Sequence, residues 1–142
     1  MEIVLSNVTS PEVLQLFSEH DDFIINFLGN DSMYYTRYNE SENIHNVWVA
    51  YCDDMPIGCV AYRIKSPGVG EVKRMFIKKE HRGHGISKSL LATVEEHSKQ
   101  HGDHTLHLDT RITLEPAVTL YRNSGFVETL RNGLYVEMEK KL

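Results

Sequence analysis

Hydrophobic positions recur along the chain with two different periods, and each period predicts one type of element. An apolar run over residues 2–5 predicts a short strand at the start of the sequence. Ser10 can then cap a helix whose first residue is Pro11, and apolar residues follow at helical spacing. We expect a second short helix over 22–28 and, after it, a polar surface loop over 29–43.

The middle of the chain carries three strand patterns separated by turns. Residues 47–51, 58–64 and 71–77 are rich in strand-forming residues, and the intervening 53–56 and 66–68 contain turn-forming residues. Because these connections are short, we expect the three strands to form a meander.

Further along, the apolar period changes to that of a helix. One helical face collects apolar residues and one histidine, namely Ile86, Leu90, Leu91, Val94 and His97. Gly102 marks the expected end of this helix. A strand over 104–109, a helix over 116–123 and a terminal hairpin of 126–130 with 135–138 complete the pattern. The strand–helix–strand unit predicts an α/β fold with a parallel or mixed sheet and helices on its faces.

Composition and charge narrow the classes of function. The chain has 142 residues, of which 41% are apolar and 25% charged, and we expect one globular domain over 1–142. A net charge of −5 argues against nucleic-acid binding and is compatible with a cationic small substrate. The chain shows neither an apolar run of ~20 residues nor a signal-peptide pattern, so no membrane partner is expected. Cys52 and Cys59 then fit reduced thiols in a cytoplasmic protein.

The most informative segment is EHRGHGISKSLL, residues 80–91, in which two glycines precede a predicted helix. The first turn of a helix presents unpaired N–H groups and the positive end of the helix dipole, so it can bind an anion. Gly83 and Gly85 would let the backbone approach a phosphate closely, and Arg82 could add positive charge. The segment therefore predicts a phosphate-binding loop.

Two nucleotide-binding motifs fit this loop poorly. A P-loop, G-x-x-x-x-G-K-[ST], would end in Lys88 and Ser89, but Ser87 stands where its second glycine belongs. A dinucleotide fingerprint, G-x-G-x-x-G, would use Gly83 and Gly85, but Lys88 replaces its third glycine. A nucleotide-binding module is therefore a weak alternative.

A third pattern fits better, and its setting agrees with it. Residues 82–87, RGHGIS, match the pyrophosphate loop Q/R-x-x-G-x-G/A of the GNAT superfamily of N-acetyltransferases, except for Ser87 at the last position. In a register shifted by two, residues 80–85, EHRGHG, match both glycines but start with Glu80. Residues 117–126, AVTLYRNSGF, resemble the A-x-x-L-Y-x-x-x-G-F signature of that superfamily, and order and spacing agree. The resemblance covers most of the chain from Trp48 onward. It implies the GNAT fold, with a mixed central sheet of about seven strands flanked by helices, and acetyl-CoA as co-substrate.

The resemblance also implies a coenzyme site. Backbone groups of Met75, Phe76 and Ile77 would pair with the pantetheine arm as if it were another strand, and the N–H groups from Arg82 to Ser87 would hold the pyrophosphate. The residues expected to contact the coenzyme are Met75, Phe76, Ile77, Arg82, Gly83, His84, Gly85, Ile86, Ser87 and Asn123. The alternative for the two glycines is a tight turn without a ligand.

Two residues are candidates for catalysis. Tyr121 corresponds to the superfamily's tyrosine near the thiol sulfur, where a phenol could protonate the departing thiolate. The alternative is a tyrosine that only packs in the core. Glu71 matches a position where some members carry a general base, and its alternative is a salt-bridged strand end paired with Lys73 or Arg74.

The implied reaction is acetyl transfer to a primary amine of a small molecule or peptide, by direct attack of the amine. Tyr34, Tyr35 and Tyr38 lie in the segment that usually shapes the acceptor pocket in this superfamily. The alternative function is a catalytically silent acyl-CoA-binding sensor on the same fold. Homodimers are common in the superfamily, so a homodimer is a further candidate assembly.

Histidine spacing raises the question of a metal site. His101, His104 and His107 are spaced H-x-x-H-x-x-H. Residues three apart on a strand point to opposite faces, and His101 belongs to a helix end, so one ion could not collect all three. We therefore expect no metal.

Overall fold

The computed structural model describes residues 1–29 and 43–142. The elements are β1 (Glu2–Ser6), α1 (Pro11–Leu28), β2 (Asn46–Cys52), β3 (Met55–Ser66), β4 (Val69–Ile77), the short 3-10 helix η3 (Lys79–His81), α3 (Ile86–His101), β5 (Thr105–Arg111), α4 (Glu115–Asn123), β6 (Val127–Asn132) and β7 (Tyr135–Lys141). None of the helices in these ranges is long and apolar enough to cross a lipid bilayer.

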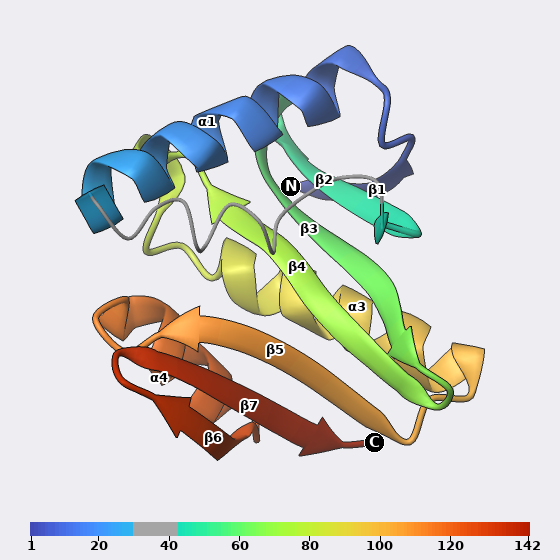
Figure 1. Cartoon of the computed structure of the whole chain (residues 1–142). Coiled ribbons are helices and arrows are strands. Elements are labelled where there is room, and N and C mark those ends of the chain that lie inside the picture. Colours follow the sequence, from blue (N-terminus) through green and yellow to red (C-terminus); the bar gives the residue numbers. More distant parts are fainter. Residues whose placement is uncertain (30–42) are drawn as a thin grey trace.

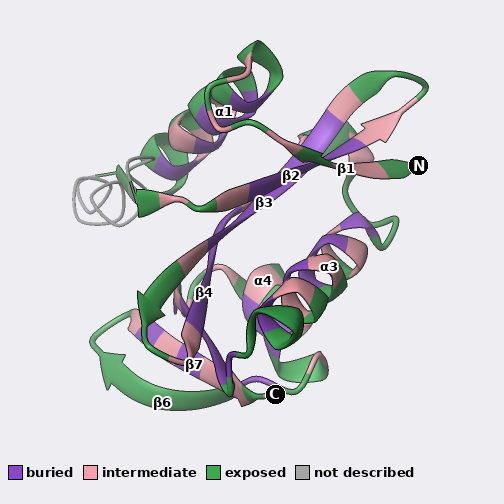
Figure 2. Cartoon of the chain, turned by 90° about the vertical axis from the view of Figure 1, so that its right-hand side faces the viewer, coloured by how far each residue is buried: buried purple, intermediate pink, exposed green. Residues whose placement is uncertain are grey.

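The strands form one seven-stranded sheet in the order β1-β2-β3-β4-β5-β7-β6 (Figure 1). Neighbouring strands are antiparallel except β4 and β5, which are parallel. Helix α1 covers one face of the sheet, and α3 and α4 cover the other (Figure 2). The predicted mixed α/β sheet with helices on its faces is confirmed.

Helix α1 differs from the sequence prediction. Two helices were expected before residue 29, but α1 runs unbroken from Pro11 to Leu28. The Ser10 hydroxyl accepts a hydrogen bond from the N–H of Val13 and so caps its start. The polar stretch in the middle of α1 does not end the helix, because His20 and Ile24 continue the buried face that contains Val13.

The remaining predicted elements are present, with longer strands. The 47–51, 58–64 and 71–77 patterns correspond to β2, β3 and β4, which form the expected antiparallel meander. The terminal hairpin is also present, as β6 paired with β7. In the strands, main-chain hydrogen bonding extends into flanking polar residues, which an apolar pattern does not reveal.

The sheet opens between its two parallel strands. β4 and β5 pair at only three positions, Val69 with Thr105, Gly70 with Leu106, and Glu71 with His107. Beyond these pairs the strands diverge, although β4 continues to Ile77 and β5 to Arg111 (Figure 1). The divergence leaves the edge of β4 after Glu71 unpaired with β5.

A bulge in β4 lies beside this opening. Cys59 pairs with Phe76 and Ala61 pairs with Lys73, so two steps along β3 span three along β4. Arg74 adopts a left-handed conformation with φ of 55°, which costs a non-glycine residue about 1–3 kcal/mol. The surroundings hold this conformation, because Arg74 Nη1 lies 2.6 Å from Asp21 Oδ1 on α1.

Candidate active site

Two cavities flank the opening between β4 and β5. One, of about 530 Å³, lies against the loop before α3 and is called here the loop cavity. The other, of about 370 Å³, lies against β4, β5 and β7 and is called the sheet cavity. His20, Met75 and Tyr121 line both cavities. These three residues therefore mark the junction of the two cavities.

The loop cavity has the features of an anion site. Gly83 and Gly85 have φ of 82° and 79°, a conformation that favours glycine, and a Cβ on either would meet no atom within 4 Å. Both glycines line the cavity together with Ile86 and Ser87, at the start of α3. Among the described residues no side chain caps this helix, so its first N–H groups face the cavity region uncapped.

The Arg82 side chain makes two contacts within the protein. Its Nε donates a hydrogen bond of 2.9 Å to the carbonyl oxygen of Ile77, and its guanidinium lies 4.8 Å from the ring centroid of Phe23. These contacts fix the end of β4 against α1 while Arg82 lines the loop cavity. The cavity edge therefore carries the Arg82 guanidinium beside an uncapped helix start, and Lys88 on the first turn of α3 lines the same cavity.

The free edge of β4 forms another wall of the loop cavity. Met75, Phe76 and Ile77 all line it, on the part of β4 that has no partner in β5. Apolar side chains from α1 and α4, including Phe23, Ile24 and Leu120, complete the wall. A long flexible ligand with an anionic end could therefore lie along β4 and end at the start of α3.

Tyr121 lies at the junction of the two cavities. Its side chain is 6% exposed, and its ring packs edge-on against Phe126 at 5.9 Å between centroids. The residue belongs to α4, whose Val118 is buried on the same side. Tyr121 thus packs in the core and also lines both cavities, so its core position does not exclude a chemical role.

Charged side chains of both signs line the sheet cavity. Lys65 and Lys73 come from β3 and β4, whereas Asp109 and Glu137 come from β5 and β7. Asp109 and Glu137 are paired across the two strands. The carboxylates therefore form the β5–β7 side of the cavity, and the two ammonium groups with the Arg74 guanidinium form the β3–β4 side.

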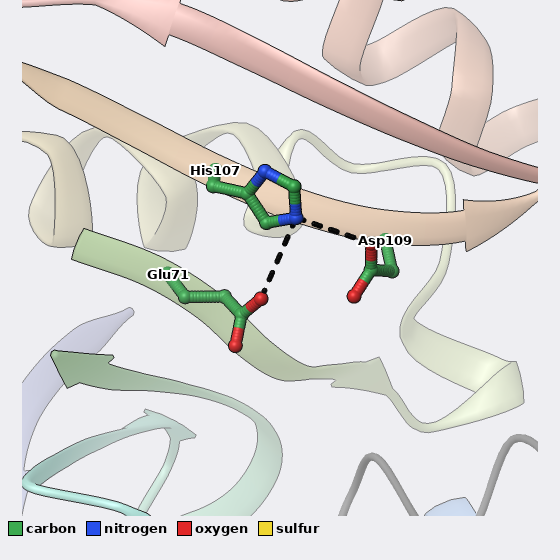
Figure 3. A group of neighbouring side chains, drawn as sticks. All are labelled: Glu71, His107 and Asp109. Atoms are coloured by element: carbon green, nitrogen blue, oxygen red, sulfur yellow. Dashed lines mark hydrogen bonds and ion pairs between the residues drawn. The ribbon is translucent and has the colours of Figure 1, made fainter. Parts of the chain in front are cut away.

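Glu71 lies behind this lining and is only 2% exposed. Its Oε1 is 2.9 Å from Arg63 Nε and 3.7 Å from Lys73 Nζ, and its Oε2 is 3.6 Å from His107 Nε2 (Figure 3). Lys65 Nζ adds a longer contact of 3.8 Å. Glu71 is therefore a salt-bridged residue where β4 and β5 still pair, and it lines neither cavity.

His107 connects Glu71 to the cavity. Its Nε2 lies 3.1 Å from Asp109 and 3.4 Å from Glu137, and its Nδ1 lies 3.3 Å from Glu139. Burial by itself lowers the pKa of His107, but the hydrogen bond and charge of Asp109 outweigh burial and raise it. For Asp109, burial raises the pKa, but His107 and the nearby lysines outweigh burial and lower it. The pair is therefore favoured as imidazolium and carboxylate.

The same group offers ligand atoms for a metal ion. One ligand atom each from Glu71, His107 and Asp109 lies within 4.8 Å of the others (Figure 3). However, Arg63, Lys65 and Lys73 surround the Glu71 carboxylate, and a divalent cation would have to overcome their charge. The arrangement fits an ion-pair network better than a metal centre.

The comparison with protein families decides which family this arrangement belongs to. A model of the acetyltransferase (GNAT) family matches residues 13–126. The chain belongs to the GNAT family. The matched range includes the loop before α3, the free edge of β4 and Tyr121, so the resemblance seen in the sequence is confirmed.

Individual GNAT relatives agree with this assignment. Mouse N-acetyltransferase 8 is 36% identical over 87 residues, which cover 58% of this chain and 38% of that protein. A Klebsiella pneumoniae protein assigned to the acyl-CoA N-acyltransferases has a TM-score of 0.80 and 26% identity, covering 99% of this chain and 97% of its own. The paia N-acetyltransferase of Thermoplasma acidophilum, solved with coenzyme A, has a TM-score of 0.77, 21% identity and full coverage of both chains. The GNAT fold is therefore confirmed. The chain spans about half the length of the curated relatives it matches.

The GNAT site brings together most of the coenzyme residues predicted from sequence. Those that line the loop cavity are Met75, Phe76, Ile77, Arg82, Gly83, Gly85, Ile86 and Ser87. His84 and Asn123 line neither cavity. His84 is exposed and donates a hydrogen bond from Nδ1 to the carbonyl of His81, and Asn123 is exposed at the end of α4.

Three further sequence predictions concern the histidines, the acceptor tyrosines and the partner of Glu71. His101 contacts Asp103, His104 contacts Thr105, and His107 contacts the carboxylates described above, so the three histidines do not converge. Tyr34, Tyr35 and Tyr38, predicted to shape the acceptor pocket, lie outside the described residues. Arg74, expected as a partner of Glu71, pairs with Asp21 instead, because the bulge directs it toward α1.

Sequence reasoning missed two residues of this site. Asp109 was not singled out, because only the register of β5 against β4 and β7 brings it to the opening. His20 was also missed, although a signal for it exists. It follows Val13, Leu16 and Phe17 at helical spacing, and a histidine within an apolar stripe indicates a polar group aimed at the interior.

Proposed function

We propose that the chain transfers an acetyl group from acetyl-CoA to a primary amine of a small molecule or peptide. One observation carries the proposal: two cavities meet where β4 and β5 part, one with the features of an anion site and one with Asp109 and Glu137 along its β5–β7 side. A coenzyme and an amine could enter from the two sides and react at the junction. Membership of the GNAT family supports the same chemistry.

The residues of the loop cavity fit the coenzyme. Acetyl-CoA would supply a thioester, whose acetyl carbon is open to attack by an amine. Main-chain groups of Met75, Phe76 and Ile77 would bind the pantetheine arm along the free edge of β4. The N–H groups at the start of α3, next to Gly83 and Gly85, would bind the pyrophosphate.

The sheet cavity would hold the acceptor. Asp109 and Glu137 would attract its ammonium group, and Asp109 would take up the released proton directly or through water. Glu71 would act indirectly, by holding His107, which contacts both Glu71 and Asp109. Tyr34, Tyr35 and Tyr38 remain proposed contributors to acceptor binding.

Tyr121 would donate a proton to the departing thiolate from its place at the junction. Direct attack by the amine is favoured over a covalent enzyme intermediate. Cys59 is buried, burial raises its pKa to about 12, and neither Cys59 nor Cys52 lines the loop cavity or the sheet cavity. No thiolate in the described residues is therefore poised as a nucleophile.

The function is tested by incubating the purified chain with acetyl-CoA and a panel of primary amines, and by measuring release of free coenzyme A thiol. We expect thiol release that depends on at least one amine and that yields its acetylated product. Coenzyme binding without transfer to any amine would instead favour the silent acyl-CoA sensor. The homodimer and the cytoplasmic location remain predictions.

A further inference from the structure

We propose that His20 donates its Nε2 hydrogen to the acetyl carbonyl oxygen and stabilises the negative charge that builds there during transfer. The inference rests on the proposed function. It adds a side-chain donor from α1 to a site otherwise formed by β4, the loop before α3 and α4. Four observations carry it, concerning the position of His20, its tautomer, its charge and the donor that remains available.

The first observation is the position of His20 at the junction of the two cavities. His20 is 5% exposed, and with Met75 and Tyr121 it lines both cavities. Met75 lies on the free edge of β4, and Tyr121 is the proposed proton donor to the thiolate. The thioester must lie between the two cavities if the amine reaches it from the sheet cavity. The imidazole is therefore at the place where the reacting carbonyl would be.

The second observation fixes the tautomer. Arg74 Nη1 lies 3.4 Å from His20 Nδ1 and meets hydrogen-bond geometry. A guanidinium only donates, so Nδ1 must accept and cannot carry a proton. Arg74 is itself held at 2.6 Å by Asp21 and at 3.4 Å by the carbonyl oxygen of Phe17. A neutral His20 therefore carries its hydrogen on Nε2.

The third observation is that the ring stays neutral. Burial and, to a smaller extent, the charge of Arg74 lower the pKa of His20 to about 3. The ring also packs against Phe76, with 5.4 Å between centroids. A ring of this kind holds its Nε2 hydrogen throughout the neutral pH range. It can donate a hydrogen bond but cannot serve as the base that deprotonates the amine.

The fourth observation is that the donor is available. Within 1–29 and 43–142, no group forms a hydrogen bond with His20 Nε2. A carbonyl oxygen that gains charge is the acceptor such a donor stabilises most. In the transfer, the bond from nitrogen to the acetyl carbon forms and the carbon–sulfur bond breaks. The acceptor first loses its ammonium proton to solvent and attacks as the neutral amine. Its second proton then leaves toward Asp109, the thiolate receives one from Tyr121, which regains a proton from solvent, and His20 keeps its own.

Two substitutions separate this role from a packing role. In His20→Gln the side-chain amide nitrogen can take the place of Nε2, but the acceptor for Arg74 is lost. In His20→Asn the amide oxygen can take the place of Nδ1 and keep Arg74 bonded, but the donor is lost. We expect His20→Gln to have a lower melting temperature than the wild type but a kcat within about tenfold of it. We expect His20→Asn to keep the wild-type melting temperature while its kcat falls about 10²-fold. Activity that follows stability, with Asn active and Gln inactive, would overturn the proposal.

Two further measurements do not depend on turnover. Nitrogen-15 NMR of the free protein should show His20 protonated at Nε2 only, with no titration between pH of about 5 and 8. A proton on Nδ1, or titration in that range, would overturn the proposal. Calorimetry should show that wild type and Gln bind acetyl-CoA about threefold to tenfold more tightly than coenzyme A, a preference that Asn lacks. If no amine is acetylated, the proposed function fails, and the NMR and the ligand preference still decide the role of His20.

Discussion

Gly70 lies directly against Asp103: a methyl group on Gly70 would stand 2.7 Å from Asp103 Oδ2. The same methyl would stand 2.5 Å from Tyr62 and 2.6 Å from the Ser98 hydroxyl, both of which donate hydrogen bonds to Asp103. Burial raises the pKa of Asp103, but these hydrogen bonds outweigh burial and lower it. The absence of a side chain at Gly70 thus lets β3, β4 and α3 meet around one buried carboxylate, next to Glu71.

Gly70→Ala should therefore destabilise the fold. We expect a loss of about 3 kcal/mol in the free energy of unfolding, because the methyl overpacks the core and displaces hydrogen bonds to a charged group. Urea unfolding followed by circular dichroism measures it. Gly133→Ala is the control, since its φ of 61° is strained but its surroundings are open, and it should lose only about 1 kcal/mol. Equal losses in both variants would contradict the crowding argument.

Gly83→Asp should abolish coenzyme A binding, because a carboxylate would enter the proposed pyrophosphate site at the start of α3. Gly83→Asn has nearly the same shape and the same backbone strain without the charge, so it should bind more tightly than the Asp variant. Isothermal titration calorimetry on folded proteins gives both affinities. Gly85→Asp should behave like Gly83→Asp. Unchanged affinity in the two Asp variants would remove the pyrophosphate from this loop.

Tyr121→Phe tests the proposed proton donor. The phenylalanine keeps the packing on Phe126, so coenzyme affinity and melting temperature should change little. The kcat with a saturating amine should fall about 10²-fold, the low end of the usual range, because a thiolate leaves tolerably without help. An intact kcat in a stable variant would leave Tyr121 as a core residue only.

Asp109→Asn tests which carboxylate serves the acceptor. We expect kcat/KM for the amine to fall by about 10²-fold, because Asp109 lines the sheet cavity. Glu139→Gln is the matched control, since Glu139 contacts His107 at Nδ1 but lines neither cavity. Its kcat/KM should stay close to that of the wild type. A folded Glu71→Gln variant that loses activity while Asp109→Asn retains it would make Glu71 the direct base.

His107 should make stability depend on pH. Its pKa is raised in the folded state, so its stabilising contribution is complete below the unfolded value of 6.5 and is lost as pH rises through the folded pKa. The difference in unfolding free energy between wild type and His107→Gln should therefore be larger at pH of about 6 than at about 9. Urea unfolding at both pH values measures it, with the exposed His84→Gln as control. If the difference in unfolding free energy is larger at the higher pH, the pKa of His107 is not raised in the folded state.

The sequence alone predicted most of the elements, with the unbroken α1 as the exception, and it predicted the proposed anion site. Periodicity predicted α3 from Ile86 to Gly102 and the β2–β4 meander, because these depend on local burial patterns. The roles of Gly83 and Gly85 in the loop could be predicted because a left-handed backbone conformation before a helix is a local requirement that glycine meets. The GNAT signatures around Arg82 and Tyr121 added the family, which the family match confirms.

Only the tertiary structure decided what surrounds the junction of the two cavities, where we propose that the reaction takes place. The parting of β4 from β5 after Glu71, and with it the separation of Glu71 from the cavity that Asp109 lines, depends on strand register. His20 reaches the same junction from α1, more than fifty residues before Arg74, through packing that no local pattern encodes. Local spacing determines which face of an element a side chain occupies, but long-range packing determines which other side chains it meets there.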